Sequence, residues 1–292
     1  MKEPSVIHAH EGHVMCVRFT PDSTTMATAG MDGMVKLWSV PDWRFVESLE
    51  GHSQSVNTLS CGPKCRLVAT GSTDTTVRLW EFPSGQLLRT LKGHGRTVSA
   101  VRVAPDGRTV ASGSYDATVK LWNVDSGEEI VTMEGHKRNV SSLAFVAGGG
   151  ILASAGLGNE ILLWQVPAGK LVDRLPGHET AVTALAVSPD GSWLASSGYD
   201  RAVRLWATAD WRNEETLETD AGGWLPLAFS PDGKTLAVGA EHRLLLWSME
   251  SGALAEEVAA APHDVHSVTF SPDGRLLAAG SDDGRVRVWE LR

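Results

Sequence analysis

Seven tryptophans recur along the chain at an almost constant spacing. They lie 42, 42, 42, 42, 41 and 42 residues apart, at Trp38, Trp80, Trp122, Trp164, Trp206, Trp247 and Trp289. The chain holds 11 tryptophans against 2 tyrosines and 6 phenylalanines, so most of this excess is periodic. A fixed period near 40 residues predicts a propeller or another repeat array, in which each unit buries its faces against its neighbours.

Each repeat shows the pattern of short antiparallel strands. In the third repeat, residues 109–114 and the segment that ends at Trp122 alternate with the two-residue period of strands. A Pro-Asp-Gly turn recurs at residues 105–107, 189–191, 231–233 and 272–274. Four strands in about 42 residues make one propeller blade. The sequence therefore predicts an all-β fold, a seven-bladed β-propeller of four-stranded antiparallel blades.

The two ends of the chain predict how the ring closes. The chain stops soon after Trp289, so the last blade lacks its outermost strand. Residues 4–9 precede the first repeat and occupy the place that outer strands hold elsewhere. We expect these residues to pair with the last blade, because a closed ring hides the sheet edges that an open array exposes. Residues 1–292 are then expected to form a single propeller domain.

The repeats resemble the WD-repeat family. The residues that carry the resemblance are Gly93-His94, Ser112, Asp116 and Trp122, within the run SGSYDATVKLW, which is similar to TGSTDTTVRLW, SSGYDRAVRLW and AGSDDGRVRVW. The resemblance covers the whole chain and implies a seven-bladed fold, although the Trp-Asp pair that names the family is absent from every repeat. Usage of Ala, Gly and Arg with few Lys resembles that of prokaryotic members.

The resemblance also implies a buried hydrogen-bond relay of His, Ser or Thr, Asp and Trp inside a blade. Such a set is chemically complete, because an indole N–H only donates whereas a hydroxyl both donates and accepts. By register, the relay is expected in the first, second, third and fifth blades, as His10, Thr28, Asp32 and Trp38; His52, Thr70, Asp74 and Trp80; His94, Ser112, Asp116 and Trp122; and His178, Ser196, Asp200 and Trp206.

Spacing distinguishes relay residues from similar ones nearby. His10 lies 28 residues before its tryptophan, as the histidines of the other relays do, whereas His13 lies 25 residues before it and is expected in a loop. The fourth blade has Gly158 in place of Asp, the sixth keeps only its tryptophan clearly, and the seventh has Ala279 in place of the hydroxyl. We expect these three blades to be the less rigid part of the ring.

The charge of the chain bears on its possible partners, and its cysteines bear on its compartment. The formal net charge is -9, from 35 acidic and 26 basic residues, which argues against nucleic-acid binding because that requires a basic surface. Cys16, Cys61 and Cys65 show no paired spacing and are interpreted as reduced thiols in a cytoplasmic protein. The longest uncharged run fits two strands better than a membrane segment. We therefore expect a cytoplasmic monomer that binds neither nucleic acid nor membrane.

No motif predicts catalysis, a cofactor or a metal. The chain lacks a Gly-rich phosphate loop, an HExxH sequence and a nucleophile elbow. Four copies of one His, Ser or Thr, and Asp set do not describe a single active site, so the relays are interpreted as structural. His8, His10 and His13 resemble a metal cluster, but they are expected on a strand, in the relay and in a loop.

Loops at the narrow top face, around the central channel, are the predicted binding site. Members of the resembled family usually bind peptides there, and loops on a rigid scaffold commonly carry function. By register, the candidates are His13, Met15, Met31, Asn57, Thr73, Arg96, Tyr115, Arg138, Asn139, Leu157, Thr183, Tyr199, Leu225, His266 and Asp282. Interface hot spots favour aromatic residues and Arg, so the best candidates are Tyr115, Tyr199, Arg96 and Arg138.

We interpret the chain as a non-catalytic scaffold for a protein or peptide partner. One alternative is a subunit that binds a small molecule in the channel or regulates an enzyme, which predicts a pocket with a perturbed acid or base. A second binding surface is possible at an acidic edge, although charge on outer strands also blocks aggregation. This edge is predicted from Glu214, Glu215, Glu218, Asp220, Glu256 and Glu257.

Overall fold

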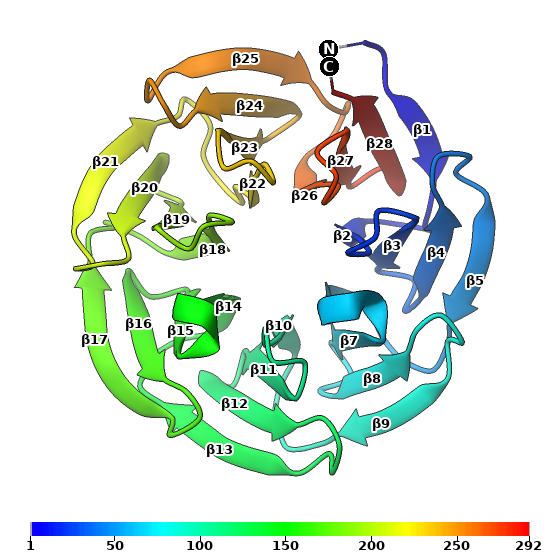
Figure 1. Cartoon of the computed structure of the whole chain (residues 1–292), viewed down its shortest axis with the longest axis vertical. Helices are drawn as coiled ribbons and strands as arrows, with labels where there is room; N and C mark the ends of the chain where they lie inside the picture. Colours follow the sequence, from blue (N-terminus) through cyan, green and yellow to red (C-terminus); the bar gives the residue numbers. More distant parts are fainter. Residues whose placement is uncertain (1, 292) are drawn as a thin grey trace.

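The predicted seven-bladed β-propeller is confirmed. A computed structural model describes residues 2–291, apart from the side chains of Cys65 and Ala147. Seven four-stranded antiparallel sheets surround a central axis, and in each blade the strands follow one another outward from that axis (Figure 1). The thiol of Cys65, expected to be reduced, lies outside the described side chains.

The first four blades have one plan. Strands of the first are β2 (Val14–Phe19), β3 (Thr25–Gly30), β4 (Val35–Ser39) and β5 (Phe45–Leu49). The second has β6 (Val56–Cys61), β7 (Leu67–Ser72), β8 (Val77–Glu81) and β9 (Leu87–Leu91), with the 3-10 helix η1 (Pro63–Cys65) between its first two strands. The third has β10 (Val98–Val103), β11 (Thr109–Ser114), β12 (Thr118–Asn123) and β13 (Glu129–Glu134). The fourth has β14 (Val140–Val146), η2 (Ala147–Gly149), β15 (Ile151–Gly156), β16 (Glu160–Gln165) and β17 (Lys170–Pro176).

Among the last three blades, the fifth follows the same plan, the sixth has a short first strand, and the seventh is completed by the first strand of the chain. The fifth has β18 (Val182–Val187), β19 (Trp193–Gly198), β20 (Ala202–Ala207) and β21 (Asn213–Glu218). The sixth begins with a strand of three residues and has β22 (Leu227–Phe229), β23 (Thr235–Ala240), β24 (Arg243–Ser248) and β25 (Leu254–Ala259). The seventh combines β26 (Val265–Phe270), β27 (Leu276–Ser281) and β28 (Arg285–Glu290) with β1 (Ser5–His8).

Local chemistry explains the turns between the first and second strands of a blade. In the third blade, Asp106 Oδ1 accepts the backbone N–H of Arg108 at 2.8 Å and that of Thr109 at 3.1 Å. Gly107 has a φ of 68°, a conformation that costs glycine little because it has no Cβ. The recurring Pro-Asp-Gly sequence therefore encodes the same reversal of the chain in blade after blade.

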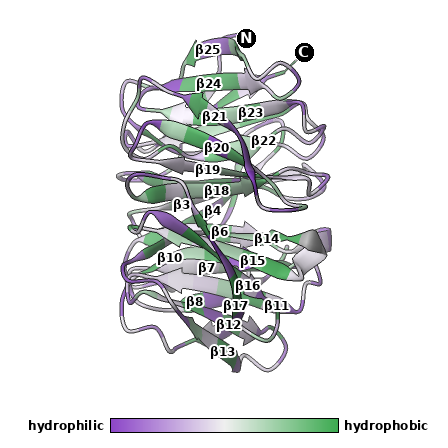
Figure 2. Cartoon of the chain, turned by 90° about the vertical axis from the view of Figure 1, so that its left-hand side faces the viewer, coloured by the Kyte–Doolittle hydropathy of each residue, from purple (hydrophilic) through white to green (hydrophobic). Residues whose placement is uncertain are grey.

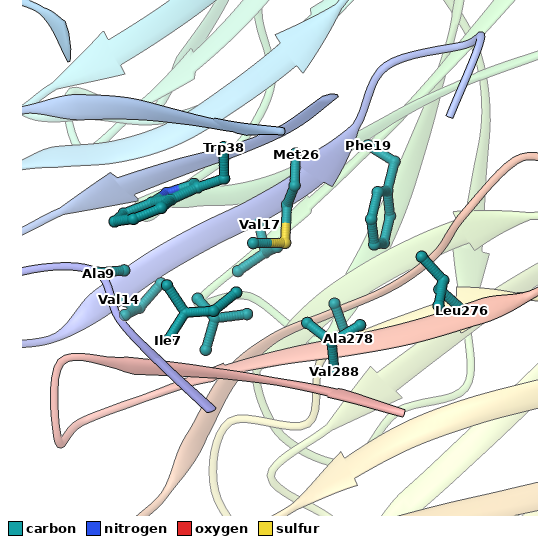
Figure 3. Close-up of a cluster of buried hydrophobic side chains, with 11 residues drawn as sticks. Ile7, Ala9, Val14, Val17, Phe19, Met26, Trp38, Leu276, Ala278 and Val288 are labelled. Atoms are coloured by element: carbon teal, nitrogen blue, oxygen red, sulfur yellow. The ribbon is translucent and has the colours of Figure 1, made fainter. Parts of the chain in front are cut away.

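The ring closes between the two ends of the chain, as predicted. Strand β1 pairs antiparallel with β28, with Ile7 opposite Val286 (Figure 1). Side chains from β1, β27 and β28 pack against those of the first blade in one buried cluster (Figure 3). Its members are Ile7, Ala9, Val14, Val17, Phe19, Met26, Trp38, Leu276, Ala278, Val286 and Val288. The first strand therefore completes both a sheet and a core.

Each of the seven buried hydrophobic clusters joins two adjacent blades. The cluster that contains Leu37 and Leu49 of the first blade also contains Val56 and Trp80 of the second, for example. Seen edge-on, the blades stack as layers of strands around the ring (Figure 2). Every blade face is therefore covered by its neighbour, and hydrophobic burial at about 25 cal/mol per Å² stabilises the ring interface by interface.

Within residues 2–291, no helix reaches the length and hydrophobicity needed to cross a bilayer.

The predicted acidic edge lies on the outer strands of the fifth and sixth blades. Its glutamates lie on β21 and β25, but Asp220 lies beyond the end of β21. Its carboxylate pairs with Arg243 at 2.8 Å, and Arg243 also pairs with Glu257 of β25 at 3.1 Å, so Asp220 links two blades.

Deletion of residues 1–9 is expected to lower the melting temperature by roughly 5–10 °C and to promote aggregation, because it removes the buried Ile7 and Ala9 and exposes the edge of β28. Thermal unfolding and size-exclusion chromatography measure both effects. Deletion of residues 1–3, which leaves β1 intact, is the matched control. Equal melting of the two truncated proteins would contradict closure by β1.

Candidate functional site

The third blade contains the complete hydrogen-bond relay. Trp122 donates its indole N–H to Ser112 Oγ at 2.7 Å, and Ser112 Oγ lies 2.8 Å from His94 Nε2. His94 Nδ1 lies 2.9 Å from Asp116 Oδ2, which also accepts the backbone N–H of Gly95. The network therefore runs from the middle of the blade to the two loops that form its top edge.

The first, second and fifth blades repeat these contacts. His Nε2 lies 2.8 Å from the hydroxyl in all three, and the indole N–H donates to the same hydroxyl at 2.9 to 3.0 Å. In the fifth blade Arg204 also contacts Asp200 at 2.8 Å. The hydroxyls of Thr28, Thr70, Ser112 and Ser196 are fully buried, so no substrate reaches them and they serve structure rather than nucleophilic chemistry.

The other three blades depart from this arrangement. The fourth keeps the bonds from His136 and Trp164 to Ser154, but has no carboxylate at the far end. In the sixth, the buried indole N–H of Trp247 has no hydrogen-bond partner among residues 2–291, and the aligned position of β23 is Val238. In the seventh, the carboxylate of Asp283 instead forms an ion pair with the guanidinium group of Arg287 at 2.7 Å.

Burial sets the protonation of the relay. It lowers the pKa of His94, so this imidazole is neutral at pH 7. Burial alone would raise the pKa of Asp116, but hydrogen bonds from Thr118, Gly95 and His94 lower it to about 2. His136 lacks a carboxylate partner, and burial together with nearby Arg174 lowers its pKa to about 4.

On the top face, two adjoining hollows lie over the third, fourth and fifth blades. One is lined by Tyr115, Arg96 and Asn139, the other by Tyr199, and both are lined by Leu157, Lys137 and Arg138. Tyr115, Leu157 and Tyr199 are 42%, 40% and 46% exposed. They sit in the turns after β11, β15 and β19, whereas the cations lie in the loops before β10 and β14.

The hollows carry positive charge. Arg96, Lys137 and Arg138 are exposed, and within residues 2–291 none of them pairs with a carboxylate. Glu179 lines the hollow beside Tyr199, and Asp116 lines the hollow beside Tyr115. We call this surface, formed by Arg96, Tyr115, Lys137, Arg138, Leu157 and Tyr199, the aromatic–basic groove. It contrasts with a chain whose net charge is -9.

Other predicted top-face residues lie elsewhere on this face. Met15, Asn57 and His266 line the upper part of the central channel. Asn57 donates to Thr73 Oγ1 at 3.1 Å, and Met31 is exposed in the turn after β3. His13 and Asp282 contact each other at 2.9 Å where the last blade meets the first.

Two of the predicted binding residues are buried. Leu225 is 0% exposed and packs between the fifth and sixth blades, and Thr183 is 1% exposed, with its hydroxyl within 3.1 Å of Ser197 Oγ. Leu225 departs from the register because β22 starts only at Leu227, so no regular strand holds the preceding residues. Leu225 is therefore inaccessible to a partner, whereas Thr183 lines the channel cavity with almost no exposed surface.

Trp224 was missed for the same reason. It is 37% exposed and lines the channel cavity together with His266. In the fifth blade the buried Val182 precedes the channel-lining Thr183, but in the sixth the exposed Trp224 precedes the buried Leu225. The available signal was a tryptophan outside the 42-residue period, directly after Gly222-Gly223.

Two arginines line the channel between its two cavities. Arg18 and Arg102 line both the upper cavity, of about 80 Å³, and the cavity at the opposite mouth. Their guanidinium groups donate to the carbonyls of Val17 and Val101, and no carboxylate within residues 2–291 pairs with them. Burial and the like charge of Arg18 lower the pKa of Arg102 to about 10.

Comparison with known families identifies the repeats. The model of the WD domain, G-beta repeat, matches residues 1–39, 43–81, 85–123, 127–165, 169–207 and 259–290. The unmatched stretch, 208–258, contains nearly all of the sixth blade, where the relay is lost. The matches cover well over half of the chain.

Similar curated proteins match only short stretches. The chain is 44% identical over 46 residues to U4/U6 small nuclear ribonucleoprotein Prp4 of Homo sapiens, covering 16% of this chain and 9% of that protein. It is 34% identical over 62 residues to Elongator complex protein 2 of Saccharomyces cerevisiae, covering 20% and 8%. It is 45% identical over 51 residues to WD repeat-containing protein RUP2 of Arabidopsis thaliana, covering 18% and 14%. These relatives are eukaryotic, so the resemblance to prokaryotic members is not supported.

His136 is expected to make the stability depend on pH. It is neutral in the folded state down to about pH 4, whereas the unfolded chain binds this proton below its ordinary pKa of 6.5. The free energy of unfolding should therefore fall as the pH decreases from 6.5 to 4. In His136→Gln this slope should be smaller, by up to about 1.4 kcal/mol per pH unit for one proton.

Urea unfolding at pH 7, 5.5 and 4.5 measures the slope. The exposed His8, on β1, supplies the control variant His8→Gln, which should keep the wild-type slope. Identical slopes in all three proteins would show that His136 is not neutral in the fold.

Proposed function

Because the chain belongs to the WD-repeat β-propeller family, we propose that it is a non-catalytic scaffold that binds an acidic segment of a partner protein in the aromatic–basic groove. WD-repeat propellers generally act as protein-interaction scaffolds and are typically non-catalytic. Two relatives bear the names of a ribonucleoprotein and of a complex protein. These names describe those proteins and agree with the general role.

The groove supports the proposal through its chemistry. Tyr115, Leu157 and Tyr199 offer apolar surface in line across three blades, and large exposed aromatic side chains are characteristic of binding hot spots. The groove also offers three cations, Arg96, Lys137 and Arg138. A carboxylate of a partner can bind them without breaking an ion pair within residues 2–291. A segment that carries both carboxylates and apolar side chains satisfies both sets.

The scaffold beneath the groove supports the same function. The relays of the third and fifth blades fix the turns that carry Tyr115 and Tyr199, because Asp116 and Asp200 each accept a backbone N–H from the neighbouring loop. Rigid loops lose little conformational entropy when a partner binds. The groove is therefore preorganised on its two outer sides.

The double variant Tyr115→Ala/Tyr199→Ala is expected to weaken binding at least about 10-fold, since truncation of hot-spot aromatics costs more than about 1.4 kcal/mol. Random peptides displayed on phage and selected on the wild-type protein supply the ligand, and fluorescence polarisation measures affinity. Selected peptides should be acidic, and their affinity should fall with added salt and in Arg138→Glu.

The matched control is Val46→Ala/Val172→Ala, which truncates exposed apolar side chains on the outer strands β5 and β17. It should leave affinity unchanged. Peptides that bind the tyrosine double variant as tightly as the wild type would place the binding site outside the groove.

The channel supports a second candidate, the binding of a small anion. Arg18 and Arg102 present two guanidinium groups without a carboxylate partner among residues 2–291, beside a cavity of about 80 Å³. An anion between them relieves the repulsion that lowers the pKa of Arg102. A cavity of this size admits an ion such as phosphate rather than a cofactor.

Low millimolar phosphate is expected to raise the melting temperature of the wild-type protein but not that of Arg18→Gln/Arg102→Gln, because only a bound ligand stabilises the native state. Without phosphate, the variant should melt at or above the wild-type temperature, since the like-charge repulsion is gone. Arg89→Gln, on the outer strand β9, is the control. Equal stabilisation of all three proteins would exclude this site.

A further inference from the structure

We propose that His13, His266 and Asp282 bind one divalent transition-metal ion where the last blade meets the first. Each of these side chains offers one ligand atom, and the three atoms lie within 4.8 Å of one another. Among residues 2–291, no other group of three or more His, Cys, Asp or Glu side chains gathers in this way. This site differs from the His8, His10 and His13 set considered in the sequence.

Closure of the ring creates the site. His13 lies in the loop before β2 of the first blade, whereas His266 lies on β26 and Asp282 in the turn after β27 of the seventh. These two blades share the buried cluster that contains Val14, the residue next to His13. The three ligands therefore come together only when both ends of the chain are folded into one ring.

The side chains already point to a common place. Asp282 Oδ1 lies 2.9 Å from His13 Nδ1 and is also in contact with His266 Nε2. The two imidazole rings are stacked, with centroids 5.5 Å apart and planes inclined by 14°. Two ring nitrogens and one carboxylate oxygen therefore lie close together, and two imidazoles with one carboxylate are a ligand set that transition-metal ions accept.

The backbone holds the loops that carry the ligands. The N–H of Met31 donates to the carbonyl of His13 at 3.0 Å, and the N–H of Asp282 donates to the carbonyl of Asp264 at 3.1 Å. A first-row transition-metal ion takes nitrogen and carboxylate ligands at about 2.0–2.2 Å, so the imidazole rings would rotate out of their stacked arrangement to bind it.

The ligand set defines the class of ion. Two imidazoles and one carboxylate are ligands for zinc and for neighbouring divalent ions such as cobalt and nickel, rather than for calcium or magnesium, which prefer oxygen. Three protein ligands leave at least one position for water or for a group of a partner. The side chains of His13, His266 and Asp282 are 44%, 23% and 28% exposed, so an ion enters from solvent.

The other histidines do not compete for the ion. His10, His52, His94 and His178 use both ring nitrogens within the relays. His8 is exposed on β1 and lies outside the cluster. Binding of one ion per chain is therefore expected, at the top face and beside the channel that His266 lines.

Titration calorimetry of the tag-free, chelator-treated chain with ZnCl₂ tests the proposal. The wild-type protein should bind one equivalent of zinc, and binding should weaken as the pH falls and the imidazoles protonate. His266→Gln and Asp282→Asn should each lower the affinity for zinc at least about 10-fold. Substitutions of residues that merely hydrogen-bond to metal ligands already cause losses of about this size. The matched control, His8→Gln/His263→Gln, removes two exposed histidines outside the cluster and should bind like the wild type.

Cobalt provides an independent readout. Co²⁺ added to the wild-type and control proteins should give visible absorption bands that zinc displaces, and the bands should be absent in His266→Gln. Melting curves without metal show whether each variant is folded. No binding by the wild-type protein, or equal affinity in the folded cluster variants and the control, would overturn the proposal, because the three side chains would then form only a hydrogen-bonded contact.

Discussion

The structure depends on the fact that no blade can bury both of its faces alone. Each four-stranded sheet presents hydrophobic side chains on two sides, and each of the seven buried clusters draws residues from two neighbouring blades. An open array would leave one face at each end exposed to water. Pairing of β1 with β28 removes this defect, because it completes the seventh sheet and the cluster around Ile7 together.

The hydrogen-bond relay adds rigidity to this ring rather than creating it. The sixth blade folds although its tryptophan indole has no partner and Val238 occupies the place of the hydroxyl. The relay instead fixes the top loops, since its carboxylate accepts a backbone N–H from the loop before the blade, as Asp116 does from Gly95. Packing therefore determines the fold, and the relay determines how firmly the binding loops are held.

The sequence predicted the features that recur in every repeat, but not the local departures from the repeat. The period of the tryptophans and the alternation within each unit set the number of blades, their strands and their closure, because these follow from local pattern. The register of the repeats placed Tyr115 and Tyr199 in turns that are exposed in the structure. It did not show that Thr183 is almost fully buried, or that the irregular entry to β22 turns Leu225 into the core.

The contact of His13, His266 and Asp282 shows a second limit of prediction from sequence, which concerns residues that are far apart in the chain. The register placed each of the three residues on the top face, but they come from opposite ends of the chain, and only the closed ring places them side by side. The same closure places this cluster, the channel and the aromatic–basic groove around one rim. The groove lies over the third to fifth blades, whereas the cluster lies between the seventh and the first. A ligand confined to either side would leave the other free, so one face of the ring offers two chemically distinct contacts that need not compete.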